Sequence, residues 1–171
     1  EISNYKFDYG TDGSGIYDLI VPGSGLKKAT QIINENIKPK FVEKIKEFEL
    51  FMDGPKMFTF ALKSVPITIK ETLKKNKIEM DDVDIFILHQ ANKFMLNSIR
   101  KKLDISEERF YIGLSDRGNT TSSTIPIALH DAIKEKVVKK NMKVLICGFG
   151  VGLSWATSVI HVSEKLINSI R

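Results

Sequence analysis

The hydrophobic residues of the chain gather in short runs that predict strands. Residues 83–89 (VDIFILH) and 143–150 (KVLICGFG) are almost continuously apolar, as expected for strands that are buried on both faces of a sheet. Residues 109–115 (RFYIGLS) and 153–162 (LSWATSVIHV) have the length and the aromatic and β-branched content of two further strands.

Between these runs, apolar residues recur at helical spacing. Residues 54–76 suit one long helix, in which Pro55 is tolerated in the first turn and Pro66 is expected to kink or split the helix. Residues 92–103 and 124–140 predict two more helices, the first with an apolar stripe opposite a basic face. Strands that alternate with helices indicate an α/β domain.

Residues 1–50 are less regular. Residues 2–10 alternate and residues 16–21 form a short apolar run, so the glycine-containing turn between them predicts a hairpin. Residues 41–51 have helical spacing and are expected to cover a surface. We expect one domain, with its core in residues 51–171 and its first strands and a variable connecting segment in residues 1–50.

Composition narrows the protein class. The chain has 171 residues, 42% of them hydrophobic, and no apolar run approaches the ~20 residues that span a bilayer. Cys147 is the single cysteine, which excludes an internal disulfide and predicts a cytoplasmic setting. The chain begins at Glu1 without a methionine or an apolar leader, and we expect it to be a piece of a longer protein. The net charge of +5 suggests an acidic or phosphorylated partner, and a lysine-rich solvated surface explains it equally well.

Three segments place unusual residues where predicted strands end. His89 and Asn92 follow the run IFIL, Asn119 opens a helix within LSDRGNTTSS (114–123), and GFGVG (148–152) joins two strands. Each has an ordinary structural explanation: a hydrogen-bonded histidine, a helix cap or a glycine turn. Because ligands of open α/β sheets bind at the carboxyl ends of strands, the three together predict a site with an imidazole, an amide and backbone N–H donors.

Four short motifs stand in order along the chain: MDGPKMF at 52–58, HQAN at 89–92, GNT at 118–120 and GFGVGLSW at 148–155. In this order they resemble the C-terminal half of β-ketoacyl-acyl-carrier-protein synthase III, a condensing enzyme. The opening ISNYKFDYGTDG resembles the end of that family's first half, and the resemblance is weakest over residues 22–50. It implies a thiolase-like half-domain with a mixed central sheet and helices on both faces.

The resemblance also implies a Cys-His-Asn triad, in which His89 and Asn119 are the histidine and the asparagine. In this family the cysteine takes an acyl group from acyl-CoA, and a malonyl thioester is decarboxylated to a carbanion that attacks the acyl-cysteine. Two neutral N–H donors stabilise the charge that develops on the thioester oxygen. The backbone N–H of Val151 matches the family's oxyanion-hole donor for acyl transfer.

The matching positions for substrate or CoA binding are Asn92, Gly54 and Phe58. Asn92 also suits the N-cap of the helix that follows it, and the two roles are compatible.

A basic surface follows the HQAN motif. The resemblance implies docking of the acidic carrier protein at Lys93, Arg100, Lys101 and Lys102, and a solvated charged face is the alternative. Helical geometry groups Lys93, Arg100 and Lys101 on one exposed face and turns Lys102 towards the apolar side.

The sequence therefore predicts the C-terminal catalytic half of a 3-oxoacyl-acyl-carrier-protein synthase III-like acyltransferase. Its reaction is the decarboxylative condensation of an acyl-CoA primer with malonyl-acyl-carrier protein in fatty acid biosynthesis. The family's nucleophilic cysteine lies in the first half, and Cys147 falls inside a predicted buried strand. We therefore expect the N-terminal half to be a required partner and the chain alone to be inactive.

For the full-length enzyme we expect a homodimer, with neither a cofactor nor a metal and no nucleic-acid partner. Two alternatives remain open. The enzyme is a related starter or secondary-metabolite ketosynthase, or the chain is a non-catalytic module that binds acyl carrier protein.

Overall fold

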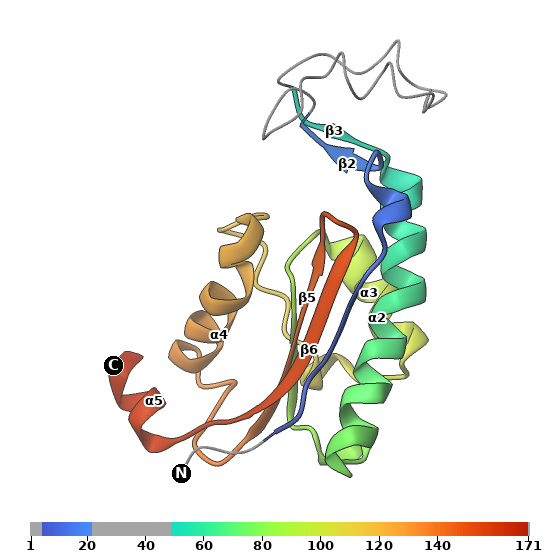
Figure 1. Cartoon of the computed structure of the whole chain (residues 1–171). Coiled ribbons are helices and arrows are strands. Elements are labelled where there is room, and N and C mark those ends of the chain that lie inside the picture. The colour runs from blue at the N-terminus through green and yellow to red at the C-terminus, as the bar shows by residue number, and fades with distance from the viewer. Residues whose placement is uncertain (1–4, 22–48, 171) are drawn as a thin grey trace.

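A mixed sheet lies at the centre of the molecule. The computed structural model describes residues 5–21 and 49–170. The sheet contains β1 (Asp8–Thr11), β4 (Ile85–Leu88), β5 (Lys143–Gly150) and β6 (Ser154–His161), in the order β1-β6-β5-β4 (Figure 1). Strands β4 and β5 are parallel, and β6 is antiparallel to both β5 and β1. The prediction of a mixed central sheet is confirmed.

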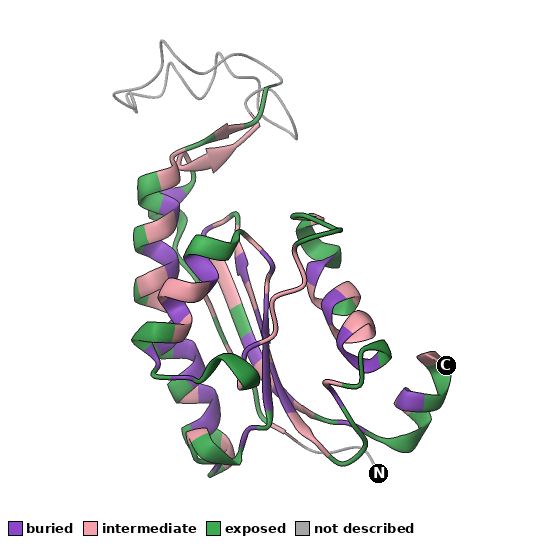
Figure 2. Ribbon diagram, turned by 180° about the vertical axis from the view of Figure 1, so that it is seen from behind, coloured by how far each residue is buried: buried purple, intermediate pink, exposed green. Residues whose placement is uncertain are grey.

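Helices cover both faces of this sheet, as predicted. Helices α2 (Gly54–Asn76) and α3 (Lys93–Lys102) pack on one face, and α4 (Thr124–Lys134) and α5 (Glu164–Ile170) pack on the other. Figure 2 shows the buried residues of α2 and α4 on the helix sides that face the sheet. Among the described residues, no helix combines the length and the apolar character that crossing a membrane requires.

Strand β4 shows why the run IFIL has no polar member. Phe86 and Leu88 belong to the core cluster under α2 and α3, whereas Ile85 and Ile87 belong to the cluster under α4 and α5. All four residues are buried because alternate side chains of a central strand enter opposite layers.

Helix α2 is one continuous helix of 23 residues, so the expectation that Pro66 would split it is wrong. The side chain of Asp53 caps its start by accepting a hydrogen bond from the Lys56 N–H at 3.0 Å. Pro66 removes one helical hydrogen bond, but it is buried between Val65 and Ile69 of the core face. Packing of that face holds the helix together through the proline.

The predicted hairpin of the first residues is also wrong. Strand β1 pairs with β6, and β2 (Leu19–Ile20) pairs with β3 (Phe51–Met52). Asp12 turns the chain away from β1, because its side chain caps the 3-10 turn Gly13–Gly15 and its backbone exchanges two hydrogen bonds with Leu153, at 2.7 and 2.9 Å. Most of the helix predicted at 41–51 lies outside the described residues, and its last residue belongs to β3.

Residues 109–115 form a single β-bridge, between Phe110 and Phe86, instead of the predicted strand. The segment follows a 3-10 turn, Glu107–Arg109. Beyond the bridge a side chain takes the place of a neighbouring strand: the Gly113 N–H donates to Oε1 of Gln90 at 2.9 Å. The amide of Gln90 thereby satisfies backbone that a ladder would otherwise pair.

The structure differs from the sequence prediction at the end of one helix and in the presence of another. Helix α4 ends at Lys134 rather than at residue 140, and Lys136 has a left-handed backbone with φ of 60°. Helix α5 was not predicted from the sequence. Short 3-10 turns at Met80–Asp82 and Thr121–Ser123 complete the described elements.

Candidate active site

His89 stands at the carboxyl end of β4. Its backbone N–H donates to the carbonyl of Cys147 in β5 at 2.8 Å, which fixes the residue between the two parallel strands. The half-buried ring meets Phe149 edge-on, with ring centres 5.4 Å apart. Burial lowers the pKa of His89 below 6.5, although a backbone hydrogen bond with Thr121 acts in the opposite direction. The imidazole is therefore uncharged at neutral pH.

Asn119 lies in the exposed loop that leads to α4. Its side-chain carbonyl Oδ1 accepts a hydrogen bond from the Thr121 N–H at 2.9 Å, closing an Asx turn. Because this turn uses the oxygen, the amide nitrogen is the part of the side chain that is left to bind a further group. Asn119 thus presents hydrogen-bond donors.

A chain of hydrogen bonds joins the two residues. Beyond its bond to Asn119, Thr121 accepts the backbone N–H of Thr124 at its carbonyl, and the Thr124 hydroxyl lies 3.1 Å from the same oxygen. The same hydroxyl lies 2.7 Å from Nδ1 of His89. Thr121 has a φ of 54°, which is uncommon for a β-branched residue and costs backbone energy. Hydrogen bonds that run through Thr124 and Thr121 therefore link His89 to Asn119.

Thr124 was not among the site residues predicted from the sequence. Its hydroxyl is one of several in the run TTSST, and nothing in that run tells which of them meets the strand end. Helical spacing is the one feature of the sequence that could have identified Thr124, because it places the first hydroxyl of α4 on the side that faces the sheet.

The glycine loop follows Phe149, the residue that contacts His89. The unusual backbone angle of this loop falls on Gly152, with φ of 139°, and Val151 does not have a positive φ. A Cβ at Gly152 would lie 2.3 Å from Oγ of Ser154, so only glycine fits there. The side chain of Val151 is 65% exposed at the loop tip.

Asn92 is the N-cap of α3, as predicted. Its Oδ1 accepts a hydrogen bond from the Met95 N–H at 2.8 Å. Gly54 is different, because a Cβ there would meet nothing within 4 Å and the residue has no positive φ. Nothing in the described structure requires a glycine at that position. Phe58 is half-buried and stacks on Phe94, with ring centres 5.3 Å apart.

The predicted exposed face of α3 does not include Arg100. Its side chain is 11% exposed and donates to the carbonyl of Ile105 at 3.0 Å and to Glu107 at 2.6 Å. The prediction that Arg100 lies on a free basic face is wrong, because its guanidinium closes the turn after α3. Lys93 and Lys101 are exposed, as predicted.

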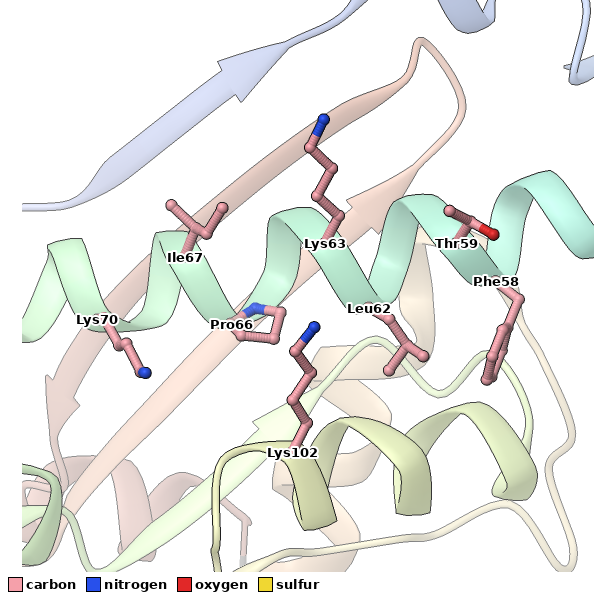
Figure 3. Close-up of a pocket in the computed structure, with 8 residues that line it drawn as sticks. All are labelled: Phe58, Thr59, Leu62, Lys63, Pro66, Ile67, Lys70 and Lys102. Carbon is pink, nitrogen blue, oxygen red and sulfur yellow. The ribbon is translucent and has the colours of Figure 1, made fainter.

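Lys102 lies along a shallow groove between α2 and α3. Figure 3 shows its side chain reaching from the end of α3 towards Leu62 and Pro66 of α2. Lys63 and Lys70 line the same groove. The stem of Lys102 thus covers apolar surface while its charge stays exposed, which agrees with the predicted turn towards the apolar side.

The remaining candidates do not form a site. Cys147 is fully buried, and burial raises the pKa of its thiol to about 12, so it remains protonated. His161 lies at the opposite end of the sheet, paired with Lys143 at the start of β5. Within the described ranges, no group of three or more His, Cys, Asp or Glu residues is placed to hold a metal ion.

Comparison with known families decides the relationship. Residues 73–162, more than half of the chain, match the family model of the 3-oxoacyl-[acyl-carrier-protein (ACP)] synthase III C terminal. The chain belongs to this family. The matched range of the synthase III C-terminal domain contains His89, Asn92, Asn119 and Val151, whereas Gly54 and Phe58 precede it.

The same relationship holds for individual relatives. The β-ketoacyl-[acyl-carrier-protein] synthase III of Clostridium tetani is 36% identical over 158 residues, which cover 88% of this chain and 45% of the relative. The synthase III of Natranaerobius thermophilus is 36% identical over 155 residues and is covered to the same 45%. The chain therefore spans about half the length of the curated relatives that it matches.

Solved structures confirm the thiolase-like α/β fold. The 3-oxoacyl-(acyl-carrier protein) synthase of Burkholderia xenovorans superposes with a TM-score of 0.81 and 34% identity, over 92% of this chain and 44% of that one. The priming β-ketosynthase of the R1128 polyketide pathway superposes with a TM-score of 0.75 and 25% identity, over the same shares of the two chains.

Proposed function

We propose that this chain supplies the histidine and the asparagine of a condensing active site. The enzyme would be a cytoplasmic acyltransferase of the 3-oxoacyl-acyl-carrier-protein synthase III type, acting in fatty acid biosynthesis. It would join an acyl-CoA primer to the two-carbon unit of malonyl-acyl-carrier protein with loss of carbon dioxide. The family relationship supports the reaction class.

One observation carries the proposal: a hydrogen-bonded path through Thr124 and Thr121 links two uncharged side chains that can donate N–H bonds, His89 at the end of β4 and Asn119 in the loop before α4. Burial favours the neutral form of His89, and the Asx turn uses the oxygen of Asn119, which leaves its amide nitrogen as the group that can donate. Loss of carbon dioxide from a malonyl thioester leaves negative charge on the thioester oxygen. Neutral donors that are fixed in advance stabilise this charge without giving up a proton.

The glycine loop at 148–152 suits the acyl-transfer steps of the reaction. When the acyl group moves onto and off a cysteine, negative charge develops on its carbonyl oxygen, and a backbone N–H can stabilise it. We assign this role to the N–H of Val151, at the tip of the loop that Gly152 and Asp12 hold in place. Gly54, Phe58 and Asn92 are proposed to contact CoA or the pantetheine arm, and the unexplained glycine at position 54 fits the close approach of a ligand.

The nucleophile must come from outside this chain. Its single cysteine is buried in β5 with a pKa raised to about 12, which leaves almost no thiolate at neutral pH. We therefore propose that a cysteine-bearing N-terminal half completes the site and that the chain alone is inactive. Separately, we propose that the complete enzyme is a homodimer.

The test joins this chain to a cysteine-bearing first half of the family and measures condensation of acyl-CoA with malonyl-acyl-carrier protein. His89→Ala or Asn119→Ala should lower kcat by about 100-fold or more while leaving the thermal unfolding midpoint nearly unchanged. His161→Ala, at the opposite end of the sheet, is the matched control and should retain full activity. Wild-type rates in both site variants would exclude the assignment.

Carrier docking is proposed for Lys93, Lys101 and Lys102. The internal hydrogen bonds of Arg100 exclude it from that surface. Replacing Lys101 and Lys102 with Glu should raise KM for malonyl-acyl-carrier protein at least tenfold and leave kcat within about twofold, because the reversed charge replaces attraction of an acidic partner by repulsion at a surface away from the proposed donors. The same variant assayed with malonyl-CoA is the control, and an equal loss with both substrates would contradict docking.

A starter ketosynthase is the second candidate. The superposition with the R1128 priming β-ketosynthase covers as much of this chain as that with the Burkholderia enzyme. Comparing acetyl-CoA with longer acyl-CoA primers in the same assay distinguishes the two.

A further inference from the structure

An uncharged histidine carries one ring proton, and its position decides what His89 can do. If the proton is on Nδ1, it points back towards Thr124, and Nε2 can only accept a hydrogen bond. If it is on Nε2, the ring has a donor on the side away from Thr124. Burial sets the charge of His89 but does not choose between the two nitrogens.

The hydroxyl of Thr124 is placed to make that choice. Thr124 is 3% exposed, and its single hydroxyl proton has two acceptors in reach: Nδ1 of His89 at 2.7 Å and the carbonyl of Thr121 at 3.1 Å. That carbonyl already accepts the backbone N–H of Thr124. We therefore expect the hydroxyl to donate along the shorter contact, to Nδ1 of His89, whose length is typical of a hydroxyl donor.

We propose that Thr124 is a positioning residue: its hydroxyl donates to Nδ1 of His89 and thereby keeps the ring proton on Nε2. Its consequence for catalysis rests on the proposed function, in which His89 must donate to the thioester oxygen. The tautomer itself is a property of this chain and needs neither substrate nor a second half.

The experiment is ¹⁵N NMR of the histidine rings in the 171-residue chain at neutral pH, where the shifts of the two ring nitrogens show which one is protonated. His89→Gln identifies the signals of His89 among those of the three histidines. Wild type and Thr124→Ser should show the proton on Nε2. Thr124→Val keeps the shape but removes the hydroxyl, so part or all of the population should shift to Nδ1–H. Ser123→Ala, a hydroxyl deletion one residue earlier, should not change the spectrum.

Two results would overturn the inference. The first is a wild-type spectrum in which the His89 ring is protonated on Nδ1. This result decides the question even if Thr124→Val fails to fold. The other is a folded Thr124→Val chain whose His89 keeps the wild-type tautomer.

Activity separates this inference from the proposed function. In the joined enzyme, Thr124→Val should lower kcat at least tenfold with little change in KM, and Thr124→Ser should restore it. If the tautomer shifts as expected but His89→Ala retains full condensation, the proposed function fails and the role of Thr124 in setting the tautomer stands.

Discussion

His89 illustrates how burial tunes a single residue. In the unfolded chain its imidazole titrates near 6.5, and in the folded chain burial lowers this pKa. The unfolded state therefore binds more protons below about pH 6.5, so the free energy of unfolding falls as the pH decreases through that value. The same shift favours the uncharged form of the ring in the folded chain.

An NMR titration of the His89 ring should give a midpoint below 6.5. In the joined enzyme, the acid limb of kcat/KM should likewise lie below 6.5, because protonation removes the neutral imidazole. A midpoint at or above 6.5 in the folded chain would contradict the argument from burial.

Gln90 shows how one side chain shapes an element. It is 2% exposed, donates to the carbonyl of Leu88 at 2.7 Å and accepts from the Gly113 N–H at 2.9 Å. The residue lies directly after His89, so the same amide that anchors the segment 109–115 also fixes the strand end from which His89 projects.

Gln90→Ala should lower the free energy of unfolding by about 1–3 kcal/mol, because buried backbone groups lose their partner. Gln90→Glu should lower the free energy of unfolding further at neutral pH, since a buried carboxylate would face the Leu88 carbonyl. Part of the lost stability should return as the pH falls and the carboxyl group is protonated. Chemical denaturation at two pH values measures both, with the exposed Ser122→Ala as control. A Gln90→Glu variant as stable as wild type at neutral pH would refute this role.

The elements also show what the sequence can and cannot predict. Strands β4, β5 and β6 and helix α3 were predictable because each carries its own pattern, a buried apolar run or a capped amphipathic stripe. The partner of β1 was not, because pairing depends on a contact with residues more than 140 positions away. The segment 109–115 looks like a strand locally, and only the buried amide of Gln90 explains why its pairing stops after one bridge.

The candidate site also contains residues that the sequence predicts and residues that it does not. His89 and Asn92 were readable from their place after a buried run, and Asn92 is indeed a helix cap. The internal role of Arg100 was not readable, because helical spacing alone places it beside exposed lysines and does not show the carbonyl of Ile105 that it binds.

Across the whole molecule, the first described strand closes the structure. β1 pairs with β6 near the chain's other end, and Asp8 joins it to α2 by accepting hydrogen bonds from Thr68 at 2.7 Å and Lys75 at 2.6 Å. Burial alone would raise the pKa of Asp8, but these hydrogen bonds outweigh it and lower the pKa below 3.8. The charged carboxylate therefore stabilises the fold at neutral pH.

Asp8→Asn should reduce the free energy of unfolding by about 1 kcal/mol at pH 7. The sign of the pH dependence follows from the lowered pKa: the wild-type advantage is complete above about pH 4 and disappears as the pH falls through the folded pKa. Urea unfolding at pH 7 and at pH 3 tests this, with the exposed Asp116→Asn as control. A difference that grows on acidification would contradict the assignment.

The hydrogen-bond chain from His89 through Thr124 and Thr121 to Asn119 has an evolutionary consequence. The two side chains that we propose act on one oxygen are both hydrogen-bonded to the same six-residue loop, so a substitution that moves Thr121 is expected to disturb both. Mutations within the loop should be strongly epistatic, with double variants hardly worse than single ones. Such a loop is expected to diverge by concerted replacement, and a designer who moves this chemistry to another scaffold would need to transfer residues 119–124 together.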